Sequence, residues 1–163
     1  MSLGGGARRD KLPPRMEGRW LTASEEETRA LGRELAAELA PDGVLLLSGD
    51  LGSGKTVLAQ GVAQGLGIDP GEVQSPTFNL IREHRGSRGG LIHVDLYRLD
   101  PEQVGSLGLD ELLAGPGVKV VEWAERLPFP VPGARALRLT RAAGEAGGRE
   151  IVETTTTSSS RET

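Results

Sequence analysis

The chain has 163 residues, of which 37% are hydrophobic and only 3% aromatic, and its formal net charge at pH 7 is −4. This length suits one domain with its own core, and the absence of cysteine excludes disulfides, thiolate metal sites and a cysteine nucleophile. The negative charge argues against broad, sequence-independent binding of nucleic acid, which needs a dominant positive field.

The two ends of the chain lack the apolar periodicity of helices and strands. Residues 1–17 are rich in Gly, Pro and Arg and predict a flexible leader, while residues 157–163 predict a disordered polar tail. The leader has no apolar stretch of the secretory type, and no segment approaches the roughly 18 apolar residues that cross a bilayer. We therefore expect one domain over residues 18–156 in a cytoplasmic protein without membrane contact.

The domain opens with a strand and a capped helix. Arg19–Thr22 predicts a short edge strand. Ser24, with Glu27 three residues later, predicts an N-cap and capping box for a helix that ends at Pro41. The apolar residues of this helix recur every four positions and form a single stripe. They are Leu31, Leu35 and Leu39.

The middle of the chain continues this alternation. Val44–Leu47 is a short apolar run, as expected of a strand that is covered on both faces. A helix is predicted over Gly54–Leu66, with its apolar positions facing inward. Ser75–Ile81 and Leu91–Leu96 then predict two strands around the glycine-rich turn GSRGG.

The last part of the domain predicts two short helices, a buried strand and a hairpin. Asp100, followed by proline, is a good helix cap, and Leu109–Leu113 predicts a further helical turn or two. Val118–Val121 predicts a buried strand, and Ala136–Leu139 with Ile151–Thr155 predicts a closing hairpin at the sheet edge. The alternation predicts an α/β fold. We expect a three-layer sandwich like the P-loop NTPases, with a mainly parallel central sheet and an antiparallel edge hairpin.

A glycine-rich motif, GDLGSGKT over Gly49–Thr56, lies between a predicted strand and a predicted helix. Glycines let backbone N–H groups approach phosphate oxygens, and the helix points its positive end at the anion. Lys55 supplies an ammonium for the β- and γ-phosphates, and the Thr56 hydroxyl can ligate Mg²⁺. This context favours ATP binding over a chance match among 24 glycines. The predicted nucleotide-binding residues of the loop are Leu51, Gly52, Ser53, Gly54, Lys55 and Thr56.

Two acidic residues, Asp95 and Glu122, each follow a predicted strand. Hydrolysis needs a second hold on Mg²⁺ and a positioned water, and ligands of open α/β sheets bind at the carboxyl ends of the strands. We therefore predict that both acids belong to the active site. The alternative is that each caps a strand or pairs with an arginine.

Three further residues have weaker signals. Thr77, in the sequence Ser-Pro-Thr, could offer its hydroxyl to Mg²⁺ or to the γ-phosphate, or could belong to a plain turn. His93 is interpreted as a strand residue that faces a polar partner rather than as a catalytic group. Trp123 is expected to pack in the core or to anchor a partner protein.

Four motifs occur in an order and spacing that resembles one bacterial family. They are GDLGSGKT, SPTF at Ser75–Phe78, HVDLYRL at His93–Leu99 and VEWAE at Val121–Glu125. On these motifs the chain is identified as a member of the TsaE (YjeE) family of tRNA threonylcarbamoyladenosine biosynthesis. The resemblance extends over about residues 21–149.

The resemblance implies a small cytoplasmic P-loop ATPase that uses ATP and Mg²⁺. The family is needed for the threonylcarbamoyl modification of adenosine 37 in tRNA, a role implied here by the four motifs. Its members do not perform the transfer themselves. They bind a complex of TsaB and TsaD, and their ATP-to-ADP cycle supports its repeated turnover, so any contact with tRNA is expected to be indirect.

The resemblance also implies roles for single residues. Leu51–Thr56 match the ATP-binding loop, Thr56 and Glu122 match the Mg²⁺ ligands, and Asp95 matches the acid of the nucleotide site. Ser53 stands where the family usually has alanine, a mild change inside the loop. Further positions that match nucleotide contacts are Thr22, Glu25 and Arg149. The residues implied to act in catalysis are Lys55, Asp95 and Glu122.

Other functions remain open on the residues alone. A small-molecule kinase would share the phosphate cradle, but it needs a substrate pocket and usually a cationic lid, and no arginine-rich lid segment is evident. A GTPase is disfavoured because the guanine-reading motif N-K-x-D does not occur. A third alternative is a nucleotide-gated binding module, in which ATP organises an interface and hydrolysis is incidental.

Overall fold

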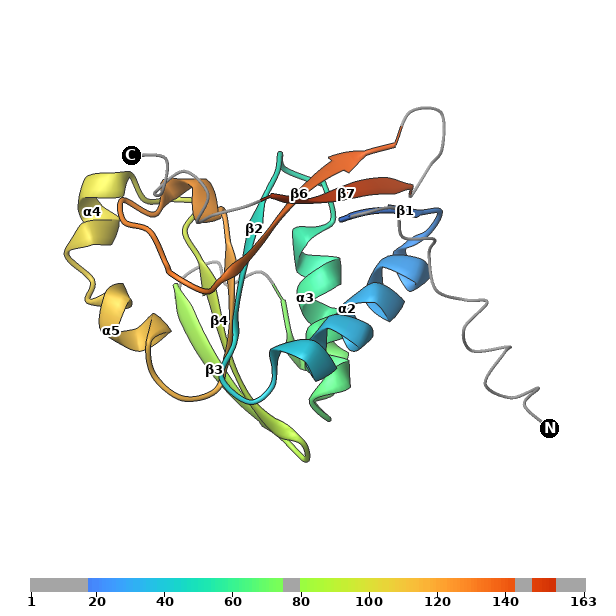
Figure 1. Ribbon diagram of the computed structural model, residues 1–163, viewed down its shortest axis with the longest axis horizontal. Helices are drawn as coiled ribbons and strands as arrows, with labels where there is room; N and C mark the ends of the chain where they lie inside the picture. Colours follow the sequence, from blue (N-terminus) through green and yellow to red (C-terminus); the bar gives the residue numbers. More distant parts are fainter. Residues whose placement is uncertain (1–17, 75–79, 143–147, 155–163) are drawn as a thin grey trace.

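The computed structural model describes residues 18–74, 80–142 and 148–154 (Figure 1). The predicted leader (residues 1–17) and polar tail (residues 157–163) lie outside the described residues. No helix within the described ranges is long and apolar enough to span a membrane.

Within the described residues, seven strands form one sheet in the order β1-β7-β6-β2-β5-β4-β3. The strands are β1 (Arg19–Thr22), β2 (Val44–Ser48), β3 (Ile81–Gly86), β4 (Gly89–Asp95), β5 (Val118–Glu122), β6 (Arg135–Arg141) and β7 (Arg149–Thr154). The central pairs β6–β2, β2–β5 and β5–β4 are parallel, whereas β1–β7, β6–β7 and β3–β4 are antiparallel. The predicted parallel centre with an antiparallel hairpin is therefore confirmed.

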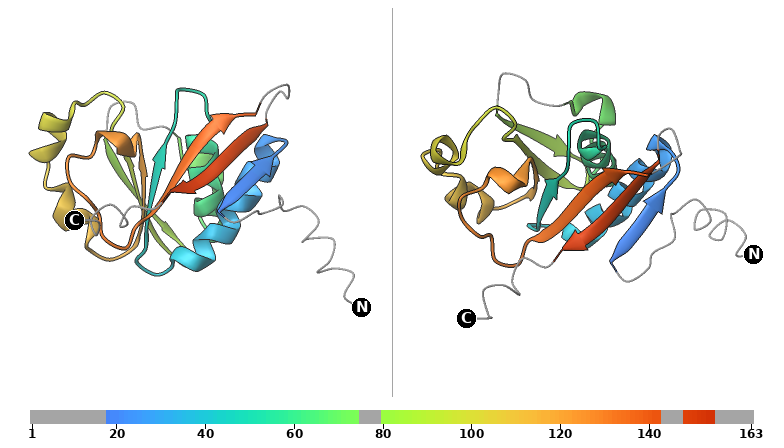
Figure 2. Two further views of the ribbon diagram at one scale, coloured as in Figure 1. Left: turned by 45° about the horizontal axis from the view of Figure 1, so that its top comes forward. Right: turned by 90° about the horizontal axis from the view of Figure 1, so that it is seen from above.

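Helices cover both faces of the sheet, which gives the predicted three layers. Figures 1 and 2 show α2 (Glu25–Leu39) and α3 (Lys55–Gly65) on one side and the short helices α4 (Pro101–Gly105) and α5 (Leu109–Leu113) on the other. Because side chains alternate along a strand, Leu45 and Leu47 of β2 belong to the core under α2 and α3, whereas Leu46 belongs to the core under α4 and α5. Two 3₁₀ turns, η1 (Pro70–Glu72) and η2 (Ala124–Arg126), complete the described elements.

Helix α2 begins as its sequence predicts. The Ser24 hydroxyl accepts a hydrogen bond of 3.1 Å from the backbone N–H of Glu27, which satisfies one unpaired donor of the first turn. The Glu27 carboxylate accepts from the N–H of Ala23 at 2.7 Å, one residue earlier than in a standard capping box. The predicted apolar stripe is buried, with Leu31, Leu35 and Leu39 each at most 5% exposed.

The two sheet edges differ from the prediction in part, although Arg19–Thr22 does form the predicted edge strand. Strand β3 begins only at Ile81 and continues to Gly86, and residues 75–79 lie outside the described residues. Its hairpin turn is shorter than the five residues of GSRGG, because Gly86 and Gly89 themselves pair across the two strands. At the opposite edge the β6–β7 hairpin is not outermost. Strand β1 pairs with β7 beyond it and thereby buries Trp20 and Thr22.

Helices α2 and α3 pack at close range through glycine. A Cβ atom at Gly61 would lie 2.3 Å from the carbonyl oxygen of Arg29 in α2. We therefore expect Gly61→Ala to lower the free energy of unfolding by about 1–3 kcal/mol, although alanine is favoured in helices by about 1 kcal/mol. Chemical denaturation measures this change.

Gly105→Ala is the matched control for this prediction. Gly105 also lies in a helix, but its added Cβ would meet nothing closer than Pro128 at 3.7 Å, an ordinary contact. This variant should be as stable as the wild type or slightly more stable. A Gly61→Ala protein that matched the wild type in stability would show that the two helices tolerate a wider separation.

Candidate functional site

The glycine-rich motif forms the connection from the end of β2 to the start of α3. Gly54 is the N-cap of α3 with a φ of 103°, a left-handed conformation that favours glycine, and among the described residues no side chain caps this helix end. The first backbone N–H groups of α3 are therefore available to an anion. This is the local structure that the motif predicts.

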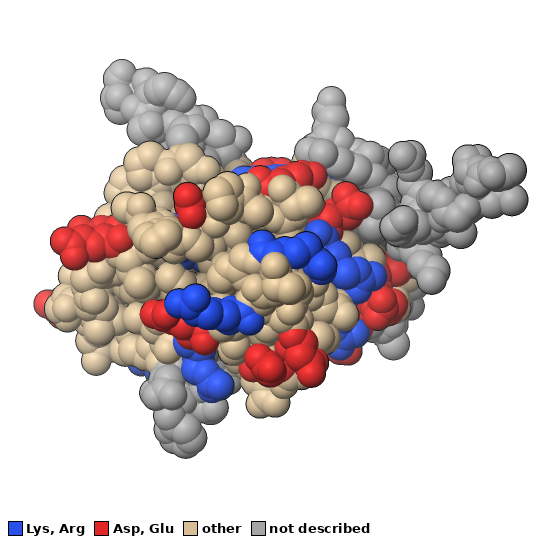
Figure 3. Space-filling view, turned by 90° about the horizontal axis from the view of Figure 1, so that it is seen from below, with Lys and Arg blue, Asp and Glu red and all other residues tan. Residues whose placement is uncertain are grey.

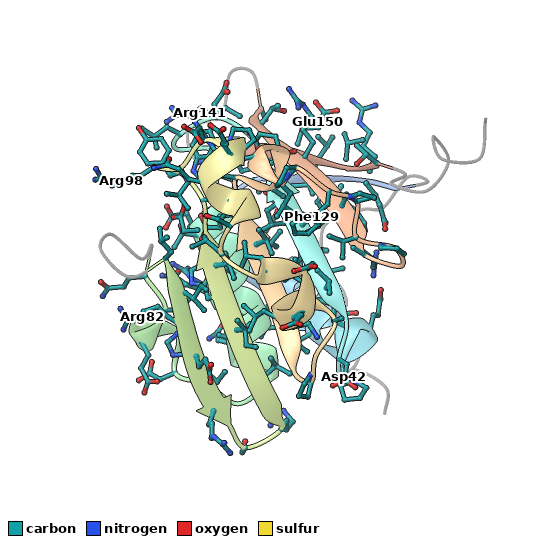
Figure 4. The ribbon with its side chains drawn as sticks, turned by 90° about the vertical axis from the view of Figure 1, so that its left-hand side faces the viewer. Asp42, Arg82, Arg98, Phe129, Arg141 and Glu150 are labelled. Atoms are coloured by element: carbon teal, nitrogen blue, oxygen red, sulfur yellow. The ribbon has the colours of Figure 1, made fainter. Side chains whose placement is uncertain are left out.

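A cavity of about 350 Å³ opens above this loop. It is lined by Glu25, Leu51, Gly52, Ser53, Gly54, Lys55, Thr56, Val57, Glu122, Trp123, Arg141 and Arg149. Figure 4 shows Arg141 at one end of the molecule and Asp42, which lies just before β2, at the other. The cavity thus lies at the carboxyl ends of the parallel strands, where open α/β sheets bind their ligands.

The Lys55 side chain is folded onto its own loop. Its Nζ donates hydrogen bonds to the carbonyl oxygens of Gly49 (2.6 Å) and Asp50 (2.9 Å), and it lies 4.1 Å from the ring centroid of Trp123. The residue is only 4% exposed. Burial lowers the pKa of the Lys55 ammonium below its usual value, against the opposing effect of nearby carboxylates led by Glu122.

The two predicted Mg²⁺ ligands meet beside the loop. The Thr56 hydroxyl donates to the Glu122 carboxylate, with distances of 3.0 and 3.1 Å to its two oxygens. The same carboxylate lies 2.6 Å from Nε2 of His93, and all of Glu122 is 2% exposed. A partly buried threonine of α3, a buried glutamate of β5 and a buried histidine of β4 therefore form one chain of polar contacts.

These residues fit a magnesium ion held together with a nucleotide. Mg²⁺ prefers oxygen ligands and in nucleotide sites takes one or two from the protein, the rest coming from phosphates and water. The Thr56 hydroxyl and the Glu122 carboxylate are such donors. Within the described ranges no cluster of three or more His, Cys, Asp or Glu side chains is placed to hold a metal.

Asp95 lies beside Glu122 at the same end of the sheet. The two residues are register partners in the parallel β4–β5 pair. Asp95 is 4% exposed, and its Oδ1 accepts a hydrogen bond of 2.9 Å from the backbone N–H of Tyr97. The structure thus brings Lys55, Asp95 and Glu122, the three residues predicted for catalysis, to one end of the sheet.

The predicted nucleotide contacts outside the glycine-rich loop do not all line the cavity. Glu25 and Arg149 line the cavity, and Nη2 of Arg149 donates to the carbonyl of Gly52 at 3.1 Å. The Thr22 side chain does not line the cavity: its hydroxyl is buried and lies 2.8 Å from that of Thr28. Thr77 lies outside the described residues.

Three residues of the cavity wall, Val57, Trp123 and Arg141, were not predicted as nucleotide contacts. Arg141 is the β6 partner of Arg149 in the β6–β7 register. A correct prediction of the hairpin register would therefore have located Arg141 beside the predicted contact Arg149. The Trp123 ring covers Lys55, contacts Tyr97 at a centroid distance of 4.9 Å and lines the cavity rather than only the core. Trp123 has a φ of 61°, the one left-handed non-glycine conformation in the described part of the chain.

A larger, open hollow of about 1000 Å³ lies between the β3–β4 hairpin and α5. Its lining includes Glu83, Gly90, Glu111 and Pro116, and none of the glycine-rich loop residues. The smaller cavity, not this hollow, holds the uncapped helix end, the lysine and the carboxylate, which are the groups that the glycine-rich motif predicts for phosphate binding.

Comparison with known proteins gives one consistent result. The family model of the threonylcarbamoyl adenosine biosynthesis protein TsaE matches residues 22–151. The tRNA threonylcarbamoyladenosine biosynthesis protein TsaE of Bacillus subtilis is 43% identical over 136 residues, which are 83% of this chain and 84% of that protein. The protein of the same name from Nostoc is 46% identical over 111 residues, 66% of this chain and 68% of the relative.

A solved structure agrees with these sequence relatives. The crystal structure of Bacillus subtilis YdiB matches this fold with a TM-score of 0.64 and 37% sequence identity, and the match covers 85% of this chain and 84% of that one. The chain belongs to the TsaE family.

Proposed function

We propose that this chain is a Mg²⁺-dependent ATPase that acts as an accessory protein in the threonylcarbamoyl modification of tRNA. The observation that carries the proposal is the meeting of Lys55, Thr56 and Glu122 at the uncapped start of α3. Family membership supports the pathway, because the relatives carry its name. We further propose that the chain works in the cytoplasm on the complex of TsaB and TsaD.

The described residues have distinct roles in this proposal. The N–H groups of Gly54, Lys55 and Thr56 would bind phosphate oxygens, whereas the N–H of Ser53 donates to the carbonyl of Asp50. Lys55 would exchange its two carbonyl acceptors for the β- and γ-phosphates. Thr56 and Glu122 would hold Mg²⁺, which when bound offsets the charge of the phosphates. Asp95 supplies a further acid beside Glu122.

The outer wall of the cavity would contact the rest of the nucleotide. Glu25, Arg141 and Arg149 converge there from three different elements. Thr22 is proposed to act on the nucleotide site indirectly, because β1 pairs Thr22 with Arg149, which lines the cavity. Thr77 is proposed as a sensor of the nucleotide state.

The charge distribution supports an indirect role with tRNA. Figure 3 shows Lys and Arg side chains interspersed with Asp and Glu on one face of the molecule, without a broad region of positive charge. The net charge of the chain is −4. Binding of nucleic acid without sequence preference needs the opposite sign. We therefore assign the chemistry on tRNA to the partner proteins.

The fate of the γ-phosphate of ATP tests the proposed activity. With Mg²⁺ and labelled ATP, we expect slow release of inorganic phosphate by the chain alone and a changed rate when TsaB and TsaD are added. Label transferred to a small acceptor would instead support a kinase. Partner binding that needs ATP, with no phosphate released, would support a nucleotide-gated binding module.

A further inference from the structure

The buried partner of Glu122 in β4, His93, has no role in the proposed function so far. His93 is completely buried, and its Nε2 lies 2.6 Å from Oε2 of Glu122. Its other ring nitrogen, Nδ1, is buried without a hydrogen-bond partner among the described residues. Because a carboxylate can only accept a hydrogen bond, Nε2 is the ring nitrogen that carries a proton and donates the hydrogen bond to Glu122.

The sheet register explains why the two side chains meet. In the parallel β4–β5 pair, Asp95 lies opposite Glu122, and His93 lies opposite Val120. Side chains two residues apart share a face of the sheet, so His93 lies on the same face as Glu122, the face under α3. Along β4 it lies two residues before Asp95, the register partner of Glu122. Strand β4 pairs on both sides, with β3 and β5. The backbone that carries the His93 imidazole is therefore fixed by hydrogen bonds to strands on both sides.

Glu122 is the last residue of β5, and its carboxylate has two described contacts. Thr56 contacts it from the cavity side, at the start of α3. His93 contacts it from the buried side. If Thr56 and Glu122 turn toward Mg²⁺, their mutual hydrogen bond is exchanged for the ion. The contact from His93 is then the one that still fixes the carboxylate.

We propose that His93 is a positioning residue that orients the Glu122 carboxylate toward Mg²⁺ and thereby sets the affinity for the metal–nucleotide complex. The inference rests on the proposed Mg²⁺ and ATP site. Carboxylates that ligate metals are commonly held by such hydrogen bonds, and losing the partner typically weakens metal affinity by about 10–100-fold. His93 itself does not contact the nucleotide in this proposal.

The test measures how much Mg²⁺ tightens nucleotide binding. The Kd of the full-length chain for a fluorescent ADP analogue is determined with Mg²⁺ and with EDTA, and the ratio of the two values is the magnesium gain. We expect His93→Leu to reduce this gain by about 10-fold or more, with the Kd in EDTA nearly unchanged. Circular dichroism confirms that each variant is folded.

Two conservative variants separate positioning from packing. His93→Gln places an amide N–H near the position of Nε2 and should restore most of the gain. His93→Asn places its amide near Nδ1, away from Glu122, and should not. If His93→Leu fails to fold, this pair decides the question, because equal gains in the two variants would contradict the inference.

The other histidine and a double variant complete the design. His84, on β3, is the second of the two histidines in the chain, and His84→Leu should keep the wild-type gain. In a Glu122→Gln background, His93→Leu should remove little further gain, because both changes act through one carboxylate.

Besides equal gains in His93→Gln and His93→Asn, two results would overturn the inference. One is a wild-type magnesium gain in folded His93→Leu, and the other is a full additional loss in the Glu122→Gln background. Either result contradicts this inference but not the proposed function. A wild-type chain that binds no nucleotide contradicts the proposed function, and this inference with it.

Discussion

Lys55→Ala is expected to weaken the binding of ATP by about 100-fold, because a charged hydrogen bond to phosphate contributes roughly 1.5–3 kcal/mol. In the absence of such an anion the Lys55 ammonium is held by the carbonyls of Gly49 and Asp50. These are weak substitutes for phosphate charge at a buried site, so the lysine should exchange them when ATP binds. Calorimetric titration of the chain with ATP and Mg²⁺ measures the change.

Lys119→Met is the matched control for this experiment. Lys119 is also a buried lysine, and its Nζ donates to the backbone carbonyls of Asp42 (2.9 Å) and Gly115. Burial lowers the pKa of Lys119 as it does that of Lys55. Asp42 lies at the end of the molecule away from the cavity (Figure 4), so this variant should change stability and leave ATP affinity intact. Unchanged affinity in Lys55→Ala would refute the nucleotide site.

Glu122→Gln is expected to reduce ATP hydrolysis by about 100-fold or more, while ATP binding is partly retained and loses only the part of its affinity that Mg²⁺ contributes. The charge of the carboxylate is lost, but the loop keeps its contacts with the phosphates. Glutamine is preferred to alanine because Glu122→Ala would leave the buried donors of Thr56 and His93 without an acceptor. Steady-state phosphate release and calorimetry together separate turnover from binding.

Glu125→Gln is the control for the loss of a nearby negative charge. Glu125 lies on η2, three residues after Glu122, and is exposed. Its replacement should leave turnover close to that of the wild type. Wild-type turnover in Glu122→Gln would instead demote Glu122 to a structural acid.

The parts of the fold that the sequence predicts well are those decided locally. The cap at Ser24 and the apolar stripe of α2 need only neighbouring residues, and both occur in the structure. Asp100 caps α4 for the same reason. The residues of the glycine-rich loop are also contiguous in the sequence, so the spacing of the motif is enough to predict what Lys55 and Thr56 can do chemically.

The parts that could not be predicted depend on pairing between distant segments. The contact of His93 with Glu122 joins residues 29 positions apart and follows from the β4–β5 register. The inward direction of Thr22 follows from the position of β1 outside β7, where alternate residues of β1 are buried. The burial of Lys55 depends on Trp123, the residue that directly follows β5.

Reconstituted tRNA modification shows whether ATP hydrolysis by this chain supports repeated turnover of TsaB and TsaD. TsaB and TsaD, their substrates, ATP and Mg²⁺ are combined with unmodified tRNA, and modified adenosine formed per TsaB–TsaD complex is counted by mass spectrometry. We expect many rounds per complex with the wild-type chain, and no more rounds with Glu122→Gln than without any chain. Full repeated turnover with a folded Glu122→Gln chain that no longer hydrolyses ATP would contradict this expectation.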